Sequence, residues 1–232
     1  MCWQGYRQGD RQGDWQGGAV LLTRYTHSCV RLESCGRVLV IDPGIWSEPE
    51  ALRGADAVLV THEHADHVDV LRLAGLGVPV HAPAGASITG LPLERVEPGA
   101  RFTAAGFSIE AVGGRHAPVL PGAPRCANLG YVVTDDGEAQ DGREGDVYHP
   151  GDALHVPATA VGTLLVPLQA SWLKLAEAVD FVRSVAPRQA VGIHDAQVNE
   201  RGLAGINGWL TTQGRTDYRY LPPGTSTGTS GP

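Results

Sequence analysis

The stretch THEHADH, Thr61–His67, places three histidines and two acidic residues within seven positions. It follows ADAVLV (55–60), a short apolar run that is typical of a buried strand. The whole chain has only 9 histidines, so the stretch is strongly enriched in them. Imidazole and carboxylate together are borderline ligands that suit Zn²⁺, Fe or Mn²⁺. The stretch therefore predicts a metal site at the end of a strand; the alternative is a polar loop whose histidines are merely solvated.

The spacing within this stretch divides its residues into two groups. In an extended or loop backbone, side chains at positions i and i+2 point the same way, so His62 and His64 can bind one ion together. Asp66 and His67 lie further along, where the chain is expected to enter a helix that begins HVDVLRLAG (67–75). They would point elsewhere and could hold a second ion.

Three residues downstream can complete such a site. His116 lies in VGGRHAPV (112–119), Asp152 in YHPGDAL (148–154) and His194 in AVGIHDA (190–196). Each follows an expected strand, and layered α/β folds gather their functional loops at strand ends. Any one of them alone would more often be structural, but together they supply enough ligands for two ions.

These motifs carry a family resemblance. THEHADH resembles the HxHxDH signature of the metallo-β-lactamase superfamily, and His116, Asp152 and His194 stand in that superfamily's order. The resemblance runs from about Leu22 to Leu210. Five segments are also similar to a bacterial branch of small metal-dependent hydrolases, close to the L-ascorbate-6-phosphate lactonase-like group: TRYTHSCVRLESCGRVLVIDPG (23–44), GRHAPV (114–119), NLGYVV (128–133), YHPGDAL (148–154) and SWLKLAEAVDFVRSVAPRQAVGIHDA (171–196).

The resemblance implies a fold and a ligand set. The fold is the α/β four-layer αββα sandwich, in which two mixed sheets face each other with helices outside and the site at one edge. The cofactors are two divalent metal ions, Zn²⁺ first, with Mn²⁺ or Fe as alternatives. Metal 1 would be held by His62, His64 and His116; metal 2 by Asp66, His67 and His194; Asp152 would bridge both.

Hydrolysis is the chemistry that such a pair of ions implies. Two ions about 3.5–4 Å apart can share a water and lower its pKa to about 7, which gives a hydroxide to attack a carbonyl carbon or a phosphorus. The expected substrate is an ester, lactone, amide or phosphodiester of a small molecule. No G-x-S-x-G nucleophile motif is present. Asp66 and His27 are the candidate catalytic residues.

Four further residues are given supporting roles. His27, in YTHSC, matches a GHS/GHA loop of the resembled branch, with Thr26 in place of glycine; it would line the pocket or donate a proton to a leaving group, or else pack in the core. Asp42, in VIDPG, would orient a metal-binding histidine through its second nitrogen, or be a turn acid. Asn128 and Trp172 are expected to face substrate, although Trp172 could simply pack.

Composition excludes several other classes of protein. The chain has 232 residues, of which 42% are hydrophobic and 19% charged, as in soluble globular proteins. Its net charge of −7 argues against nucleic acid as a partner. No apolar run approaches the roughly 20 residues of a membrane helix, and no secretory signal is apparent. The four cysteines lack CxxC spacing, so reduced thiols in the cytoplasm are expected. The sequence predicts no oligomeric state.

One globular domain, 19–221, is expected between two flexible ends. Residues 1–18 and 222–232 contain too few apolar side chains to offset ordering entropy, so their removal is expected to leave folding unchanged. Helices are expected at 173–186 and 199–213. The expected strands are 19–25, 29–34, 37–42, 57–61, 78–82, 107–114, 129–134, 146–149, 163–168 and 189–194.

Two alternative functions use the same fold. A nuclease is one, because the superfamily includes RNA-processing members; the acidic charge and the lack of an added clamp domain count against it. A catalytically silent metal-binding protein is the other, but it would be expected to have lost ligands, and all seven positions are filled. A flavodiiron-type redox protein would need a flavin domain for which there is no chain left.

Overall fold

A computed structural model describes residues 20–135 and 146–229, and within them two seven-stranded sheets. The predicted N-terminal extension 1–18 lies outside these residues. The first sheet has the order β14 (Thr225–Gly228), β1 (Leu21–Arg24), β2 (Val30–Ser34), β3 (Arg37–Ile41), β4 (Ala57–Leu59), β5 (Val80–Pro83) and β6 (Glu94–Val96). The second has the order β13 (Asp217–Arg219), β12 (Gln189–Ile193), β11 (Thr163–Pro167), β10 (Val147–His149), β9 (Ala127–Thr134), β8 (Phe107–Arg115) and β7 (Arg101–Ala104).

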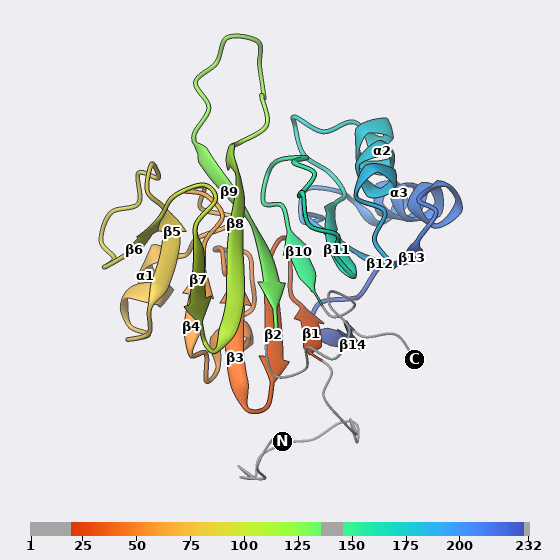
Figure 1. Ribbon diagram of the computed structural model, residues 1–232. Coiled ribbons are helices and arrows are strands. Elements are labelled where there is room, and N and C mark those ends of the chain that lie inside the picture. The colour runs from red at the N-terminus through yellow and green to blue at the C-terminus, as the bar shows by residue number, and fades with distance from the viewer. Residues whose placement is uncertain (1–19, 136–145, 230–232) are drawn as a thin grey trace.

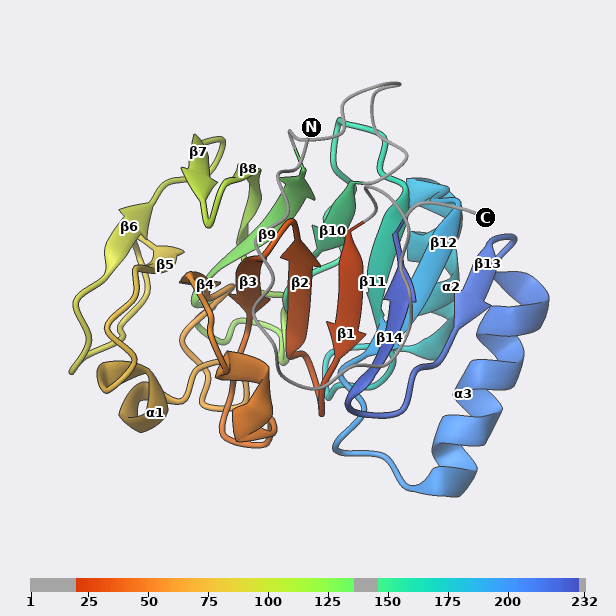
Figure 2. The same ribbon diagram turned by 90° about the horizontal axis from the view of Figure 1, so that it is seen from below.

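The sheets pack face to face, with helices outside (Figures 1 and 2). The central core lies between them and includes Leu32, Leu39 and Phe107, each fully buried. A second cluster lines the outer face of the first sheet, around Val58 and Leu73. A third lies between the second sheet and the helices near β11–β13. Three apolar interfaces make four layers, so the predicted αββα sandwich is confirmed.

Strand sequences reflect how many faces are covered. β2 alternates buried and half-buried residues, because its two faces meet different environments. β11 (TLLVP) and β12 (QAVGI) are buried at every position and pair in parallel. A parallel strand covered on both faces reads as a continuous apolar run, which is why the sequence located these strands.

The helices differ from expectation chiefly at one boundary. α2 (Leu175–Val185) and α3 (Glu200–Gln213) lie where helices were predicted. α1 covers only Val70–Ala74, beginning three residues after the expected His67. Asp69 sets this start, because its carboxylate accepts a hydrogen bond from the Arg72 N–H as an N-cap. A short 3-10 helix, η1 (Pro49–Leu52), precedes β4.

The C-terminal prediction is wrong for the described part of 222–232. β14 pairs antiparallel with β1 from Leu21↔Gly228 to Arg24↔Thr225, and Thr229 is fully buried. The ladder depends on backbone groups, which a composition argument does not see. Three further strands, β6, β7 and β13, were also not predicted; β6 and β13 have only three residues each, too few for a visible periodicity.

Deleting residues 222–232 is therefore expected to destabilise the protein. The deletion removes four paired residues of β14 and leaves β1 as an unpaired edge. At a net value of about 1 kcal/mol per hydrogen bond, the loss is roughly 2–4 kcal/mol. We expect the thermal midpoint to fall by more than about 5 °C. Calorimetry of the full-length and shortened chains is the measurement, and an unchanged midpoint would contradict the structural role of β14.

Two other observations bear on sequence expectations. Cys29 and Cys126 are free thiols, whereas Cys35 is disulfide-bonded, so the expectation of reduced thiols is wrong for Cys35. In the described parts of the chain, no helix is both long and apolar enough to cross a membrane.

Candidate metal centre

The structure brings the seven predicted ligands together at one edge of the sandwich. They lie on loops that follow β4, β8, β10 and β12. In Figure 1 this is the upper edge, where the loop between β8 and β9 projects. Their ligand atoms form overlapping clusters in which every atom lies within 4.8 Å of the others of its cluster. The seven are His62, His64, Asp66, His67, His116, Asp152 and His194; their role as ligands stays a prediction.

The first cluster consists of His62, His64 and His116. His62 and His64 are two residues apart after β4, and their Nε2 and Nδ1 atoms are 3.0 Å from each other. The ring of His116 lies 5.1 Å from that of His62 and 5.0 Å from that of His64, measured between centroids. The predicted i and i+2 pairing therefore has its third member in place.

The second cluster consists of His27, Asp66, His67 and His194, and one oxygen of Asp152 lies against two of its rings. Asp152 Oδ1 lies 3.2 Å from His67 Nε2 and 3.1 Å from His194 Nε2. The other oxygen, Oδ2, lies 3.3 Å from His116 Nε2, a member of the first cluster. Asp66 contributes Oδ2 at 3.9 Å from His67 Nε2. Asp152 thus contacts both clusters, as a shared ligand would.

Three of the histidine rings are held in place by hydrogen bonds at Nδ1. His67 Nδ1 lies 2.7 Å from Asp42 Oδ2, His116 Nδ1 lies 2.7 Å from the Ala117 carbonyl, and His194 Nδ1 lies 2.5 Å from the Gln169 carbonyl. Each ring therefore donates its Nδ1–H to the protein and directs Nε2 into the site. This is the usual arrangement of metal-binding histidines. Asp42 contacts the second nitrogen of His67, and its role in orienting a metal-bound histidine stays a prediction.

Unpartnered buried atoms test whether a metal ion fits. His67 Nε2, Asp152 Oδ1 and His194 Nε2 are buried and form no hydrogen bond. All three point toward one place, since the distances between them are short. Burying polar atoms without a hydrogen bond costs free energy, and here a cation would pair with all three. The donor set of imidazole nitrogens and carboxylate oxygens suits Zn²⁺, Mn²⁺ or Fe.

The charge states of the site residues agree with the binding of a cation. Burial opposes ionisation of Asp66, but its hydrogen bond with His27 and the proximity of His67 lower its pKa to about 2. Burial, reinforced by His67, holds the pKa of His62 well below its usual value, so this ring is neutral. Burial opposes charge on His67 as well, yet Asp152 and Asp42 raise its pKa well above the usual value. Metal binding would therefore displace a proton from His67.

His27 lies at the site as a hydrogen-bond donor. The Ala196 N–H donates to its Nδ1 at 3.3 Å, so a neutral ring carries its proton on Nε2. That nitrogen lies 3.0 Å from Asp66 Oδ2. His27 is fully buried, and burial lowers its pKa. The ring is therefore positioned to donate to Asp66.

Two predicted substrate contacts have different outcomes. Asn128 is only 1% exposed, donates to the Pro150 carbonyl and accepts from the Asp152 N–H. Both of its polar groups hold the Asp152 loop, so the prediction that it faces substrate is wrong. Trp172 Nε1 donates to Asp152 Oδ2 at 3.0 Å, and the side chain also lines a cavity beside the site.

Sequence reasoning missed several residues that position the ligands. The Thr61 hydroxyl donates to Asp42 Oδ2 at 2.6 Å, and Thr61 Oγ1 lies 3.0 Å from His62 Nδ1. One carboxylate thereby supports two histidines. His149 donates from Nε2 to the Ser28 carbonyl and accepts at Nδ1 from the Gly151 N–H. Gly44 must be glycine, since a Cβ there would lie 1.9 Å from the Asp66 carbonyl oxygen.

The backbone at the site is also unusual. His27, Asp42 and His194 adopt positive φ values of 68°, 51° and 60°. Non-glycine residues rarely adopt this conformation, and it costs free energy that the surrounding contacts must offset. Strained residues of this kind cluster at functional sites. The rings of His27 and His194 lie 3.8 Å apart, and Asp42 contacts His67 at the same site.

Comparison with known proteins identifies the family. The model of the beta-lactamase superfamily domain matches residues 21–194, about three quarters of the chain. The chain belongs to the beta-lactamase superfamily. The family predicted from THEHADH is thus confirmed, whereas the closer resemblance to the L-ascorbate-6-phosphate lactonase-like group stays a prediction.

The chain is similar in sequence to two bacterial and archaeal proteins and in structure to a solved archaeal protein. Protein Rv0786c of Mycobacterium tuberculosis is 38% identical over 208 residues, which cover 87% of this chain and 96% of that protein. The UPF0173 metal-dependent hydrolase MK1542 of Methanopyrus kandleri is 27% identical, over 75% of this chain and 83% of its own. Igni18, described as a metallo hydrolase from Ignicoccus hospitalis, superposes with a TM-score of 0.70 at 20% identity, over 91% and 98% of the two chains. This superfamily member is a metal-dependent hydrolase, as predicted.

Proposed function

We propose that this hydrolase binds two divalent metal ions and cleaves an ester, lactone, amide or phosphodiester of a small molecule. The observation that supports it most is the convergence of three buried atoms that form no hydrogen bond, His67 Nε2, Asp152 Oδ1 and His194 Nε2. Zn²⁺ is the first candidate, with Mn²⁺ or Fe as alternatives, because the donors are imidazole and carboxylate.

The two clusters suggest how the ligands divide. His62, His64 and His116 would hold one ion. Asp66, His67 and His194, which lie in one cluster with His27, would hold the other. Asp152 would be shared, since its two oxygens face different clusters. When bound, such a pair of ions supplies Lewis acidity and an activated water.

Other residues of the chain would orient the proposed metal ligands. Asp42 holds His67 directly and His62 through Thr61, which fixes both rings. Trp172 donates to Asp152 and limits its rotation. The Asp66 side chain is 20% exposed whereas His27 is buried, so Asp66 Oδ2 stands between His27 Nε2 and solvent. The hydrogen bond from His27 Nε2 would hold this carboxylate in place.

Metal analysis combined with a hydrolysis screen tests this proposal. Purified protein is expected to carry close to two divalent ions per chain, as measured by atomic emission spectroscopy. In a screen of lactones, phosphodiesters and β-lactams, at least one class should be hydrolysed. A chelator should abolish that activity and added metal should restore it. Protein that carries no metal and cannot be loaded with it would refute the proposal.

A further inference from the structure

Two cavities adjoin the candidate metal centre. The larger has a volume of about 690 Å³ and lies between the end of β8, the loop after it and the start of α2, with Trp172 in its lining. The smaller, about 350 Å³, is lined by His64 and His116. Both are lined by Ala117 and Arg125, so they meet at this loop. A molecule reacting at the metal centre could therefore extend into the larger cavity.

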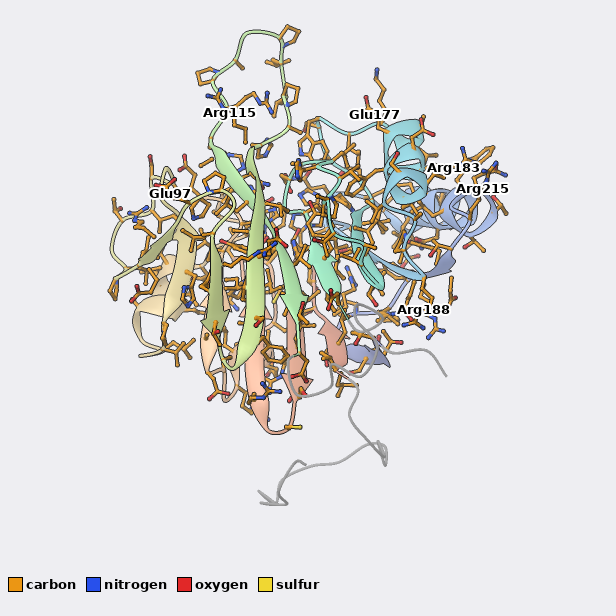
Figure 3. All side chains as sticks on the ribbon, viewed as in Figure 1. Glu97, Arg115, Glu177, Arg183, Arg188 and Arg215 are labelled. Carbon is orange, nitrogen blue, oxygen red and sulfur yellow. The ribbon has the colours of Figure 1, made fainter. Side chains whose placement is uncertain are left out.

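The larger cavity is basic in an acidic protein. Arg115 and Arg125 line it, although the net charge of the chain is −7. Figure 3 shows Arg115 at the end of β8 that leads into the site, with Glu177 on the first turn of α2. Glu177 is the acidic residue of the lining, and its carboxylate already accepts a hydrogen bond from the Lys174 N–H. Two arginines against one glutamate leave the lining with a net positive charge.

The two arginines have donors to spare. Arg125 Nε donates to the His116 carbonyl at 2.6 Å, which anchors the guanidinium beside the metal centre. Within 20–135 and 146–229, the terminal nitrogens of Arg125 form no further hydrogen bond, and the Arg115 side chain, at the end of the β8–β9 ladder, forms no hydrogen bond or ion pair. A guanidinium fixed through Nε presents its remaining N–H groups as a fork that matches carboxylate or phosphate.

Part of the lining is apolar and aromatic. Trp172 and Leu154 are half-buried and line the same cavity. Trp172 is held in place by its hydrogen bond to Asp152. Binding sites for small molecules commonly combine such apolar walls with a few directed polar groups, in volumes of about 300–1,000 Å³.

We propose that the substrate carries an anionic carboxylate or phosphate group, which Arg115 and Arg125 bind in the larger cavity. An apolar or aromatic part of the substrate packs against Trp172 and Leu154, and the bond to be cleaved lies at the metal centre. This inference rests on the proposed function. Arg115 and Arg125 are thus specificity-determining residues, outside the set of metal ligands.

Binding of simple probes tests the inference without any hydrolysis. Phenyl phosphate and phenylacetate carry the two anionic groups on an aromatic ring, and benzyl alcohol is the neutral counterpart. Each is titrated by calorimetry into metal-free and metal-loaded protein, because a bound metal could itself hold an anion. We expect both anions to bind metal-free protein and benzyl alcohol not to bind. The stronger of the two anions identifies the group preferred.

Three variants test whether the anionic probe binds at Arg115 and Arg125. Arg115→Gln and Arg125→Gln are each expected to weaken the anionic probe by roughly 10- to 100-fold, the value of a charge-assisted hydrogen bond. Arg101→Gln is the matched control: Arg101 is 76% exposed and paired with Glu110 on β7 and β8. Circular dichroism checks that all three fold. The control should bind like wild type.

Two outcomes would overturn the inference. One is that no anionic probe binds metal-free protein at millimolar concentration; the other is that both arginine variants bind it as tightly as the control. Failure of the proposed function is distinguishable from either. Protein that binds anions through Arg115 and Arg125, yet holds no metal and hydrolyses nothing, would support the anion site and refute the hydrolase.

Discussion

Replacing Asp152 with alanine is expected to abolish most activity while leaving the fold intact. Its two oxygens contact His67 and His194 on one side and His116 on the other, so it is the carboxylate common to both clusters. Without it, the second ion would keep Asp66, His67 and His194. We expect metal content to fall from near two ions per chain to nearer one. The loss of kcat should exceed the roughly 10- to 100-fold that changing a supporting residue costs.

The fold should survive because Asp152 lies on a loop after β10, and apolar strands hold the sheets together. Emission spectroscopy, circular dichroism and kcat on a substrate from the screen give the three readings. Asp180→Ala is the matched control, since that carboxylate is 73% exposed on α2. A variant that retains two ions and near-normal kcat would show that Asp152 is not shared between metals.

Replacing Asp195 with alanine is expected to destabilise the fold more than deleting residues 222–232 does. Asp195 pairs with Arg24, whose side chain is completely buried. It also accepts hydrogen bonds from the His27 N–H at 3.2 Å and the Tyr220 hydroxyl at 2.7 Å. Removing the carboxylate leaves a buried guanidinium uncompensated, which costs about 3–5 kcal/mol. The thermal midpoint should fall by roughly 10 °C.

A double variant separates the buried charge from other effects. Arg24→Leu combined with Asp195→Ala removes both charges, so it should be more stable than Asp195→Ala alone. Asp217→Ala is the control, because it breaks an exposed pair with Arg219 and should cost less than about 1 kcal/mol. Denaturant unfolding of all four proteins gives the comparison. If Asp195→Ala costs no more than the control, the buried pair does not stabilise the fold as we infer.

The same network connects the C-terminal segment to the site. Arg24 donates to the Leu221 carbonyl, and Gly224 donates to the Arg24 carbonyl. Asp195 follows His194 directly and fixes the backbone of His27. The segment that was expected to be dispensable thus contacts residues that position the centre, which is the physical reason to expect a stability cost on its removal.

Local patterns were sufficient for much of this protein. Continuous apolar runs located β11 and β12, because a strand buried on both faces must be apolar at every position. Helical spacing before Pro187 located α2. THEHADH, with His116, Asp152 and His194 after later strands, predicted the superfamily and the residues that meet at one edge. Each of these signals is carried by neighbouring residues or by their order along the chain.

Tertiary structure alone decided the rest, because the interactions join residues far apart in sequence. β14 exists through backbone pairing with β1, about 200 residues away, and its side chains carry little sign of it. Asn128 was expected to meet substrate, but a loop at Pro150 and Asp152 uses both of its polar groups. The Arg24–Asp195 pair leaves no local pattern, since an arginine in a strand is ordinarily solvent-exposed. Only the folded chain shows which polar groups are buried and what satisfies them.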